Sequence, residues 1–299
     1  MRIGPRSLGY LLAFASAATG AIRFNLAVYA KGEGFSLVPF LAGTLLVGTI
    51  CSTAHVAVRD GLGGLSPLRQ KTGSALLYGC LMAWSTLSHF LALYYLNETV
   101  MSSISQTSIL FVIALAVCFL GERFTRREWF GLVTICAGLF LFRPWTGEGL
   151  RLKGFLLLMS GVVSGALATV GAKRWVEGVL PRVLMLWRNV VALLVVGALA
   201  SAYEAPRLTA ATGVACAVTG ILGPYLHGLF FLQALERVDA AKAALVSRVQ
   251  PAIVFLVSWA FLARLPDRDE ILSAALLLAG ALWLVAARRQ PAAPPTEPD

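Results

Sequence analysis

Charge is scarce in this sequence, and that scarcity excludes an ordinary soluble domain. Only 13% of the 299 residues are charged and 58% are hydrophobic, whereas soluble domains contain about 25% charged residues. Apolar stretches recur along nearly the whole chain, and about 20 apolar residues in a helix cross the roughly 30 Å hydrocarbon core of a bilayer. The sequence therefore predicts an all-α, polytopic membrane protein.

The sequence also lacks the patterns of enzymes and metal centres. It contains no HExxH, GxSxG or P-loop motif, each of which has a specific catalytic geometry. The five cysteines lie inside apolar runs without CxxC spacing, which favours core packing over zinc binding or disulfides. We therefore expect no enzymatic activity, no metal and no cofactor.

Acidic residues are absent from the depth of the predicted spans. All 15 lie in loops, turns, span ends or the C-terminal tail, so the sequence predicts no buried carboxylate that would receive a cation or relay a proton. This argues against polycationic drugs as cargo. A zwitterion fits better, because its carboxylate can bind Arg or Gln donors while its ammonium group uses hydroxyls, carbonyls and aromatic faces.

Ten predicted spans remain once the apolar runs are divided at charges, Gly and Pro. They cover about 8–29, 35–58, 72–96, 99–120, 127–144, 152–175, 180–203, 208–235, 239–263 and 269–287. The first apolar run is too long for the h-region of a signal peptide, so we expect a retained first helix. Residues 288–299 are Pro-rich and are predicted to be a disordered cytoplasmic tail.

The net charge of +10 is carried by Lys and Arg residues in short loops between the apolar runs. This placement indicates membrane orientation and a lipid bilayer as partner, with no nucleic acid. With the N-terminus in the cytoplasm, fifteen Lys and Arg residues lie inside and seven outside. We therefore predict a multi-pass protein of the bacterial inner membrane with both termini cytoplasmic. The sequence does not predict an oligomeric state.

An internal repeat divides the chain into two halves. Residues 87–142 align without a gap with residues 229–284 at an offset of 142. The aligned positions include Arg126/Arg268, Glu128/Glu270, Gly138/Gly280 and Ser105/Ser247, and Pro39/Pro181 follow at the same offset. Five spans per half make the copies antiparallel, as in secondary transporters. We predict a first repeat over 1–146 and a second, inverted repeat over 147–287.

Two corresponding stretches carry a resemblance to a known family. They are ALYYLNETVMSSISQTSILFVIALAVCFLGERF at residues 92–124 and ALERVDAAKAALVSRVQPAIVFLVSWAFLARL at residues 234–265. The chain resembles the EamA-type members of the drug/metabolite transporter superfamily, with two departures: Ile109 replaces the usual Pro of the first copy, and Ala263 the usual Gly of the second. The resemblance implies a ten-helix fold around a central cavity, with spans 5 and 10 at the side. Bacterial exporters of aromatic and neutral amino acids are the most similar in character.

Polar and aromatic residues within the spans are the candidate substrate-binding residues. Arg248 lies within span 9, and its repeat mate is Gln106. Tyr78, Met82, Ser85 and His89 share one face of span 3, and a mixed polar and aromatic face suits a wet cavity. The full predicted set is Tyr78, Trp84, Ser85, His89, Ser103, Gln106, Trp187, Tyr225, His227 and Arg248.

Two further arginines lie within the predicted spans. We interpret Arg188 as a residue that snorkels to the inner face. Arg23 can reach the lipid headgroups, pair with Glu33 or have a functional role.

The predicted function is export of small metabolites, foremost aromatic and other neutral amino acids, by alternating access. The alternative within the superfamily is an exporter of nucleotide sugars, sugar phosphates, purines or drugs. A single deep, central arginine, rather than a cluster, counts against phosphates. A channel would have the same spans, but the inverted repeats favour a carrier.

Overall fold

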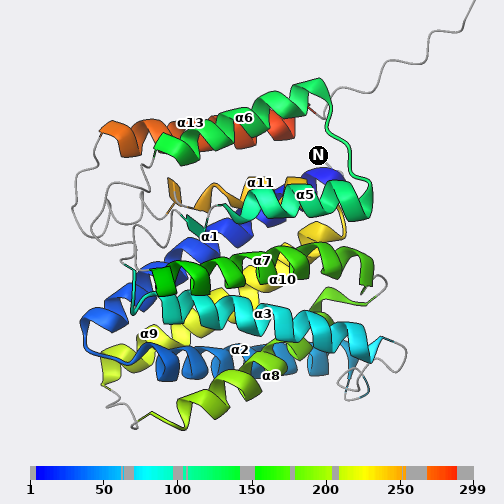
Figure 1. Ribbon diagram of the computed structural model, residues 1–299. Coiled ribbons are helices and arrows are strands. Elements are labelled where there is room, and N and C mark those ends of the chain that lie inside the picture. Colours follow the sequence, from blue (N-terminus) through cyan, green and yellow to red (C-terminus); the bar gives the residue numbers. More distant parts are fainter. Residues whose placement is uncertain are drawn as a thin grey trace, which may run out of the picture.

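The structure is a computed structural model. It describes residues 5–61, 63, 71–96, 104–105, 107–141, 152–175, 179–203, 209–250, 252–253 and 268–287. Within these ranges the regular elements are helices (Figure 1). The first half holds α1 (Pro5–Gly32), α2 (Leu37–Asp60), α3 (Thr72–Ala92), α5 (Ser108–Leu120) and α6 (Arg126–Leu141). The second half holds α7 (Leu152–Trp175), α8 (Pro181–Ala200), α9 (Ala210–Gly220), the π-helix η2 (Ile221–His227), α10 (Gly228–Leu235), α11 (Ala240–Ser247) and α13 (Arg268–Ala287).

Each predicted span holds a helix, which confirms the all-α, ten-helix fold. The elements α9, η2 and α10 follow one another without a break and form the eighth span. Among the described residues, five helical stretches are long and apolar enough to cross a membrane by length and composition, and α5 and residues 271–284 are shorter apolar helices. The predicted tail at 288–299 lies outside the described residues.

Local sequence sets where several helices begin. Leu180 is extended and Pro181 is the first residue of α8, a position where proline's missing N–H costs no hydrogen bond. At α9, the Thr209 side chain accepts a hydrogen bond from the Thr212 backbone N–H, while the Thr212 side chain accepts one from the Thr209 N–H. This reciprocal cap satisfies two backbone donors that the helix itself leaves unpaired.

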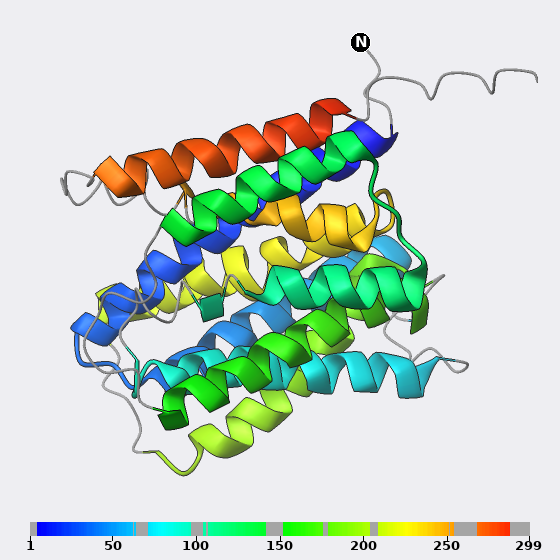
Figure 2. The same cartoon turned by 45° about the horizontal axis from the view of Figure 1, so that its top comes forward.

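The helices pack in the same pattern when the two halves are exchanged. The equivalent helices α6 and α13 pack on each other, as do α2 and α8, while the contact of α3 with α7 is matched by that of α10 with α1. Figure 1 shows α6 and α13 together at one edge of the bundle and α8 at the other, and Figure 2 shows the same order. The arrangement is that expected of two inverted repeats.

Close packing of α6 on α13 depends on glycine. A Cβ added to Gly280 would lie 2.9 Å from the backbone oxygen of Gly131, so any larger residue would push the two helices apart. Small residues allow helix backbones to approach in membranes, where contact rather than water exclusion stabilises the pair. Gly280 belongs to the repeat pair noted in the sequence, and its role here is contact between the halves.

Two equivalent spans are interrupted at equivalent positions. In the fourth span, α5 begins only at Ser108, and in the ninth, α11 ends at Ser247. Residues 105–108 and 247–250 correspond at the repeat offset of 142. Backbone bonds there are short-range, from Thr107 N–H to the Ile104 oxygen and from Arg248 N–H to the Leu245 oxygen, each 3.0 Å. Helices broken within the bilayer direct their free ends at substrate sites in transporters.

A buried cluster of charges joins the two halves at the end where α1 begins. Lys242 of α11 lies 2.8 Å from a carboxylate oxygen of Glu128 of α6, and 2.7 Å from one of Asp239. Lys242 and Glu128 are each only 1% exposed. Glu122, in the turn before α6, accepts hydrogen bonds from the first backbone N–H groups of α11, at Ala240 and Ala241. Negative charge at a helix N-terminus is favourable because of the helix dipole.

This cluster adds a buried carboxylate to the prediction that no acidic residue lies deep inside a span. Glu128 lies at a span end, as the sequence indicates, yet it is buried because Lys242 from the other half neutralises it and the Thr125 hydroxyl and N–H donate to it. A second ion pair, between Asp60 and Arg182, joins the end of α2 to the start of α8 at 2.5 Å. Charges of the two halves are therefore paired with each other, and loss of one partner of the buried pair would leave the other uncompensated.

Candidate functional site

A cavity of about 320 Å³ lies in the middle of the bundle. Its described lining residues come from α1, α2, α3, α5, α7, α8, α9, η2, α10 and α11 and from the short segments beside α3, α5 and α11, and none comes from α6 or α13. This agrees with the implied arrangement, in which spans 5 and 10 lie at the side. The cavity is therefore shared by the two halves, as a carrier's substrate site is.

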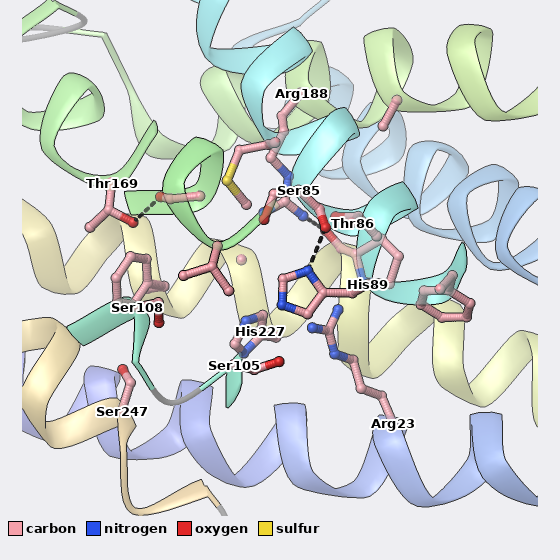
Figure 3. A pocket seen from close by; sticks show the side chains of 18 of the residues that line it. Arg23, Ser85, Thr86, His89, Ser105, Ser108, Thr169, Arg188, His227 and Ser247 are labelled. Atoms are coloured by element: carbon pink, nitrogen blue, oxygen red, sulfur yellow. Dashed lines mark hydrogen bonds between the residues drawn. The ribbon is translucent and has the colours of Figure 1, made fainter. Parts of the chain in front are cut away.

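The predicted face of α3 opens onto the cavity. Tyr78, Met82, Ser85 and His89 all line it, because their spacing places them along one side of the helix. The Nδ1 atom of His89 lies 2.6 Å from the backbone oxygen of Ser85, one turn earlier. That carbonyl accepts the imidazole proton, which fixes the ring at the cavity wall (Figure 3).

His227 is held to α1 by a compact set of hydrogen bonds. Its Nδ1 lies 2.8 Å from the backbone oxygen of Ser16 and 3.0 Å from the Ser16 hydroxyl. The same hydroxyl donates to the backbone oxygen of His227 at 2.9 Å. Since His227 ends η2, these bonds join the π-helix of the second half to α1 of the first half beside the cavity.

Arg188 is buried at the cavity and not at the membrane surface, so the snorkelling interpretation is wrong. It is 8% exposed, and its guanidinium donates to the backbone oxygen of Pro224 at 2.8 Å and to the side-chain oxygen of Asn189 at 3.2 Å. Asn189 donates to the same Pro224 oxygen at 3.0 Å and to the Ser52 hydroxyl at 3.0 Å. These neutral acceptors make an interior position tolerable.

Arg23 also lines the cavity, and Glu33 is exposed, so the expected pairing of these two residues is not found. The side chain of Arg23 crosses η2 at Gly223, where an added Cβ would lie 2.5 Å from its Cδ atom. Gly223 is thus required for the close approach of Arg23 to η2. Figure 3 shows the guanidinium of Arg23 directed toward His89.

Positive charge dominates the cavity. Arg23, Arg188 and Arg248 line it from three different spans, and none of its described lining residues is Asp or Glu. Among the described residues, no Asp or Glu forms an ion pair with Arg23 or Arg188. The charged side chains of the described lining are therefore all cationic.

The structure brings five predicted residues together and places three elsewhere. Tyr78, Ser85, His89, His227 and Arg248 line the cavity, whereas Trp84, Trp187 and Tyr225 are not among its lining residues. The predicted residues Ser103 and Gln106 lie outside the described residues.

The three residues outside the lining have other contacts. Trp84 is 43% exposed and donates to the Ser160 hydroxyl at 3.1 Å. Trp187 packs against Val56 and its neighbours in a small core cluster. The Tyr225 hydroxyl lies 3.0 Å from Nδ1 of His55.

Several lining residues were not predicted as site residues. They are small polar residues, among them Thr86, Ser105, Ser108, Thr169, Thr219, Ser247 and Gln250. The repeat offset is the signal that could have found four of them, since Ser105 corresponds to Ser247 and Ser108 to Gln250. The position of Thr86 or Thr169 along its span does not predict whether its hydroxyl group faces the cavity. That direction depends on how the neighbouring helices pack.

Comparison with known proteins agrees with this architecture. A solved crystal structure matches with a TM-score of 0.78 over 94% of this chain and 97% of that chain, at 18% identity, which shows a shared fold. No curated protein matches the chain. The profile of the EamA-like transporter family matches twice, at residues 7–143 and 152–286. One copy falls on each half of the bundle, and the chain therefore belongs to the EamA-like transporter family, whose members are secondary transporters of small metabolites and not enzymes.

Proposed function

We propose that this transporter exports amino acids from the bacterial cytoplasm, and that it binds them in the central cavity and moves them by alternating access. The proposal rests on one observation: the cavity lining contains groups that bind an anion as well as groups that can bind a cation. Guanidinium groups line it, and they favour a carboxylate. Hydroxyl groups from Ser85, Thr86 and Ser105 also line it, and they can accept hydrogen bonds from an ammonium group.

The broken helices support a zwitterionic substrate. Ser108, the first residue of α5, and Ser247, the last residue of α11, both line the cavity. The N-terminus of α5 therefore presents positive partial charge to the cavity, and the C-terminus of α11 presents negative partial charge. A carboxylate suits the first helix end and an ammonium group the second, as in other transporters with discontinuous helices.

Alternating access is supported by the symmetry of the packing. Because each half contributes equivalent contacts, an exchange of the conformations of the two halves would open the cavity to the opposite side. Export further requires the predicted orientation. A cytoplasm-active reporter fused after Arg289 should be active, and one inserted at 146–149 should be active only outside. Activity of both reporters on the same side would contradict the orientation.

Phosphorylated metabolites are the second candidate, and the structure strengthens them. The sequence argument against phosphates rested on one deep arginine, but three arginines line the cavity. A phosphate group is bound well by clustered guanidinium groups. Purines and drugs gain no similar support from the lining.

Counterflow in proteoliposomes tests the proposed function. Vesicles loaded with an unlabelled amino-acid mixture should accelerate uptake of a labelled amino acid, whereas a channel shows no such acceleration. Arg248→Ala should abolish the effect. Arg59→Gln is the matched control, because Arg59 is exposed at the end of α2 and outside the cavity lining. Absence of counterflow for every amino acid would refute the proposal.

A further inference from the structure

We propose that the preferred substrate carries two separate anionic groups, as an acidic amino acid or a small dicarboxylate does, and that Arg23 and Arg188 each bind one of them. This inference rests on the proposed function, because it concerns the same cavity. It goes beyond that function by replacing the neutral amino acids that the sequence indicates with a class defined by a second carboxylate.

The first argument is charge balance. Neither Arg23 nor Arg188 has an acidic ion-pair partner among the described residues. Buried charges without compensation are costly, and an incoming anion recovers that cost. A neutral amino acid supplies one carboxylate but also an ammonium group, so its net charge is zero. A second carboxylate gives an acidic amino acid a net charge of −1 and a dicarboxylate one of −2, so both compensate more of the positive charge than a neutral amino acid does.

The second argument is placement. Arg23 projects from α1 in the first half, and Arg188 from α8 in the second. Both side chains approach η2, Arg23 beside Gly223 and Arg188 at the Pro224 oxygen, and in the view of Figure 3 they extend from different sides. Two cations carried by separate helices fit a substrate with two anionic groups better than a single phosphate, whose negative charge is confined to one group.

The third argument is that both guanidinium groups are already positioned. Arg188 is held by the Pro224 oxygen and the Asn189 side chain, all neutral acceptors, so its positive charge is oriented without being cancelled. Arg23 is confined by its contact with Gly223. Positioned donors bind an anion without first losing side-chain freedom.

The fourth argument is size. The cavity volume of about 320 Å³ lies at the small end of the range for ligand pockets, roughly 300–1,000 Å³. A short dicarboxylate or an acidic amino acid fits this space. A nucleotide sugar contains a nucleobase, a ribose, a second sugar and a diphosphate, and this volume disfavours it.

Competition of counterflow tests the substrate class with matched pairs. Glutamate and glutamine differ by one carboxylate at nearly equal size. Succinate lacks the ammonium group, and glucose 6-phosphate places its charge on one phosphate. With labelled glutamate as the tracer, unlabelled glutamate and succinate should compete at concentrations at least about tenfold lower than glutamine, since one charge-assisted contact is worth about 1.5–3 kcal/mol.

Variants then assign the two carboxylates. Arg23→Gln and Arg188→Gln should each weaken competition by glutamate by about tenfold or more. The variant that loses the arginine of the α-carboxylate should weaken competition by glutamine to a similar extent, whereas the other variant should change it less than about threefold. Arg188→Lys keeps a charge if Arg188→Gln fails to assemble, and it should fall between Arg188→Gln and the parent protein. Arg59→Gln should leave both unchanged.

The outcomes separate this inference from the proposed function. Equal competition by glutamine and glutamate would overturn the inference and leave amino-acid transport in place. Stronger competition by glucose 6-phosphate than by succinate would also overturn it. If no amino acid, acidic or neutral, shows counterflow, the proposed function fails and this inference fails with it.

Discussion

Two groups of charged residues in the interior of this protein, one fully buried and one lining the cavity, differ in how their charges are compensated. In the cluster around Lys242, carboxylate oxygens of Glu128 and Asp239 lie within 2.8 Å of the Lys242 ammonium group. In the central cavity, Arg23, Arg188 and Arg248 line a space with no carboxylate among its described lining residues. The first group is neutralised by the protein, and the second leaves room for a solute to do so.

The difference shows how the partners of a charged side chain in the interior indicate whether that side chain stabilises the fold or binds a solute. A buried ion pair whose members come from α6 and α11 joins the halves, and its removal should disturb stability. Arginines held by neutral acceptors, as Arg188 is, are oriented but not cancelled, and their removal should disturb binding. The comparison therefore predicts two different experimental signatures, and the following variants test them from the largest effect to the smallest.

Lys242→Met should give the largest loss of stability. It leaves Glu128 buried without its cation, and breaking one partner of a buried pair costs about 3–5 kcal/mol. The thermal unfolding midpoint in detergent, followed by tryptophan fluorescence, should fall sharply. The double variant with Glu128→Leu should recover at least half of the loss, since both charges are then gone. An unchanged midpoint in Lys242→Met would show that this cluster does not contribute to the stability of the protein.

Arg23→Met should show the reverse signature. Its thermal midpoint should stay close to that of the parent protein, because the variant removes a half-buried charge that has no acidic partner among the described residues. Its apparent substrate affinity in proteoliposomes should fall by about 10- to 100-fold, the value of a charge-assisted contact. A large fall in midpoint with normal transport would make Arg23 structural.

Arg248 sharpens the comparison within the cavity. Arg248→Lys keeps the positive charge but loses the planar pair of donors that matches a carboxylate. We expect it to lower affinity by about tenfold, less than Arg248→Ala does. Initial rates of counterflow over a range of substrate concentrations would measure both. Equal activity of the Lys variant and the parent protein would show that only charge matters at this position.

The histidines test whether the cavity also relays protons. His89 and His227 line it, and no described lining residue is a carboxylate. We expect transport to persist when the pH gradient is collapsed, and the double variant His89→Gln, His227→Gln to lose affinity by about threefold, as for loss of neutral hydrogen bonds. Steep proton-driven accumulation that survives in the double variant would show that a carboxylate outside the described lining reaches the pathway.

Trp84 should give the smallest effect. It is 43% exposed and its indole donates to Ser160 on the outer side of α7, outside the cavity lining. Trp84→Phe removes one exposed hydrogen bond, so transport should change by less than about twofold. A loss as large as that of Arg23→Met would return Trp84 to the substrate site that the sequence predicts for it.

The helices and much of the cavity could be predicted because they follow from periodicity. The four residues from Tyr78 to His89 were found through their spacing on one helix face, and all line the cavity. Trp84 and Trp187 were predicted from their depth within a span, but they are not among the lining residues of the cavity, because depth does not give the direction of a side chain. Trp84 lies on the same helix as Tyr78 but faces outward, and only the packing of α3 against α7 and α8 decides which face meets lipid.

The sequence by itself determined the membrane class, the ten helices, the duplication and the family, because apolar run length and repeat offset are properties of the chain read in order. Tertiary structure alone decided the roles of the charges. Arg23, Arg188 and Arg248 are separated by long stretches of chain yet line one cavity, and Lys242 meets Glu128 across the halves. Whether a buried charge is cancelled by the protein or left for a solute depends on which distant side chain lies within a few ångströms, since electrostatic energy falls with distance in space and not along the sequence.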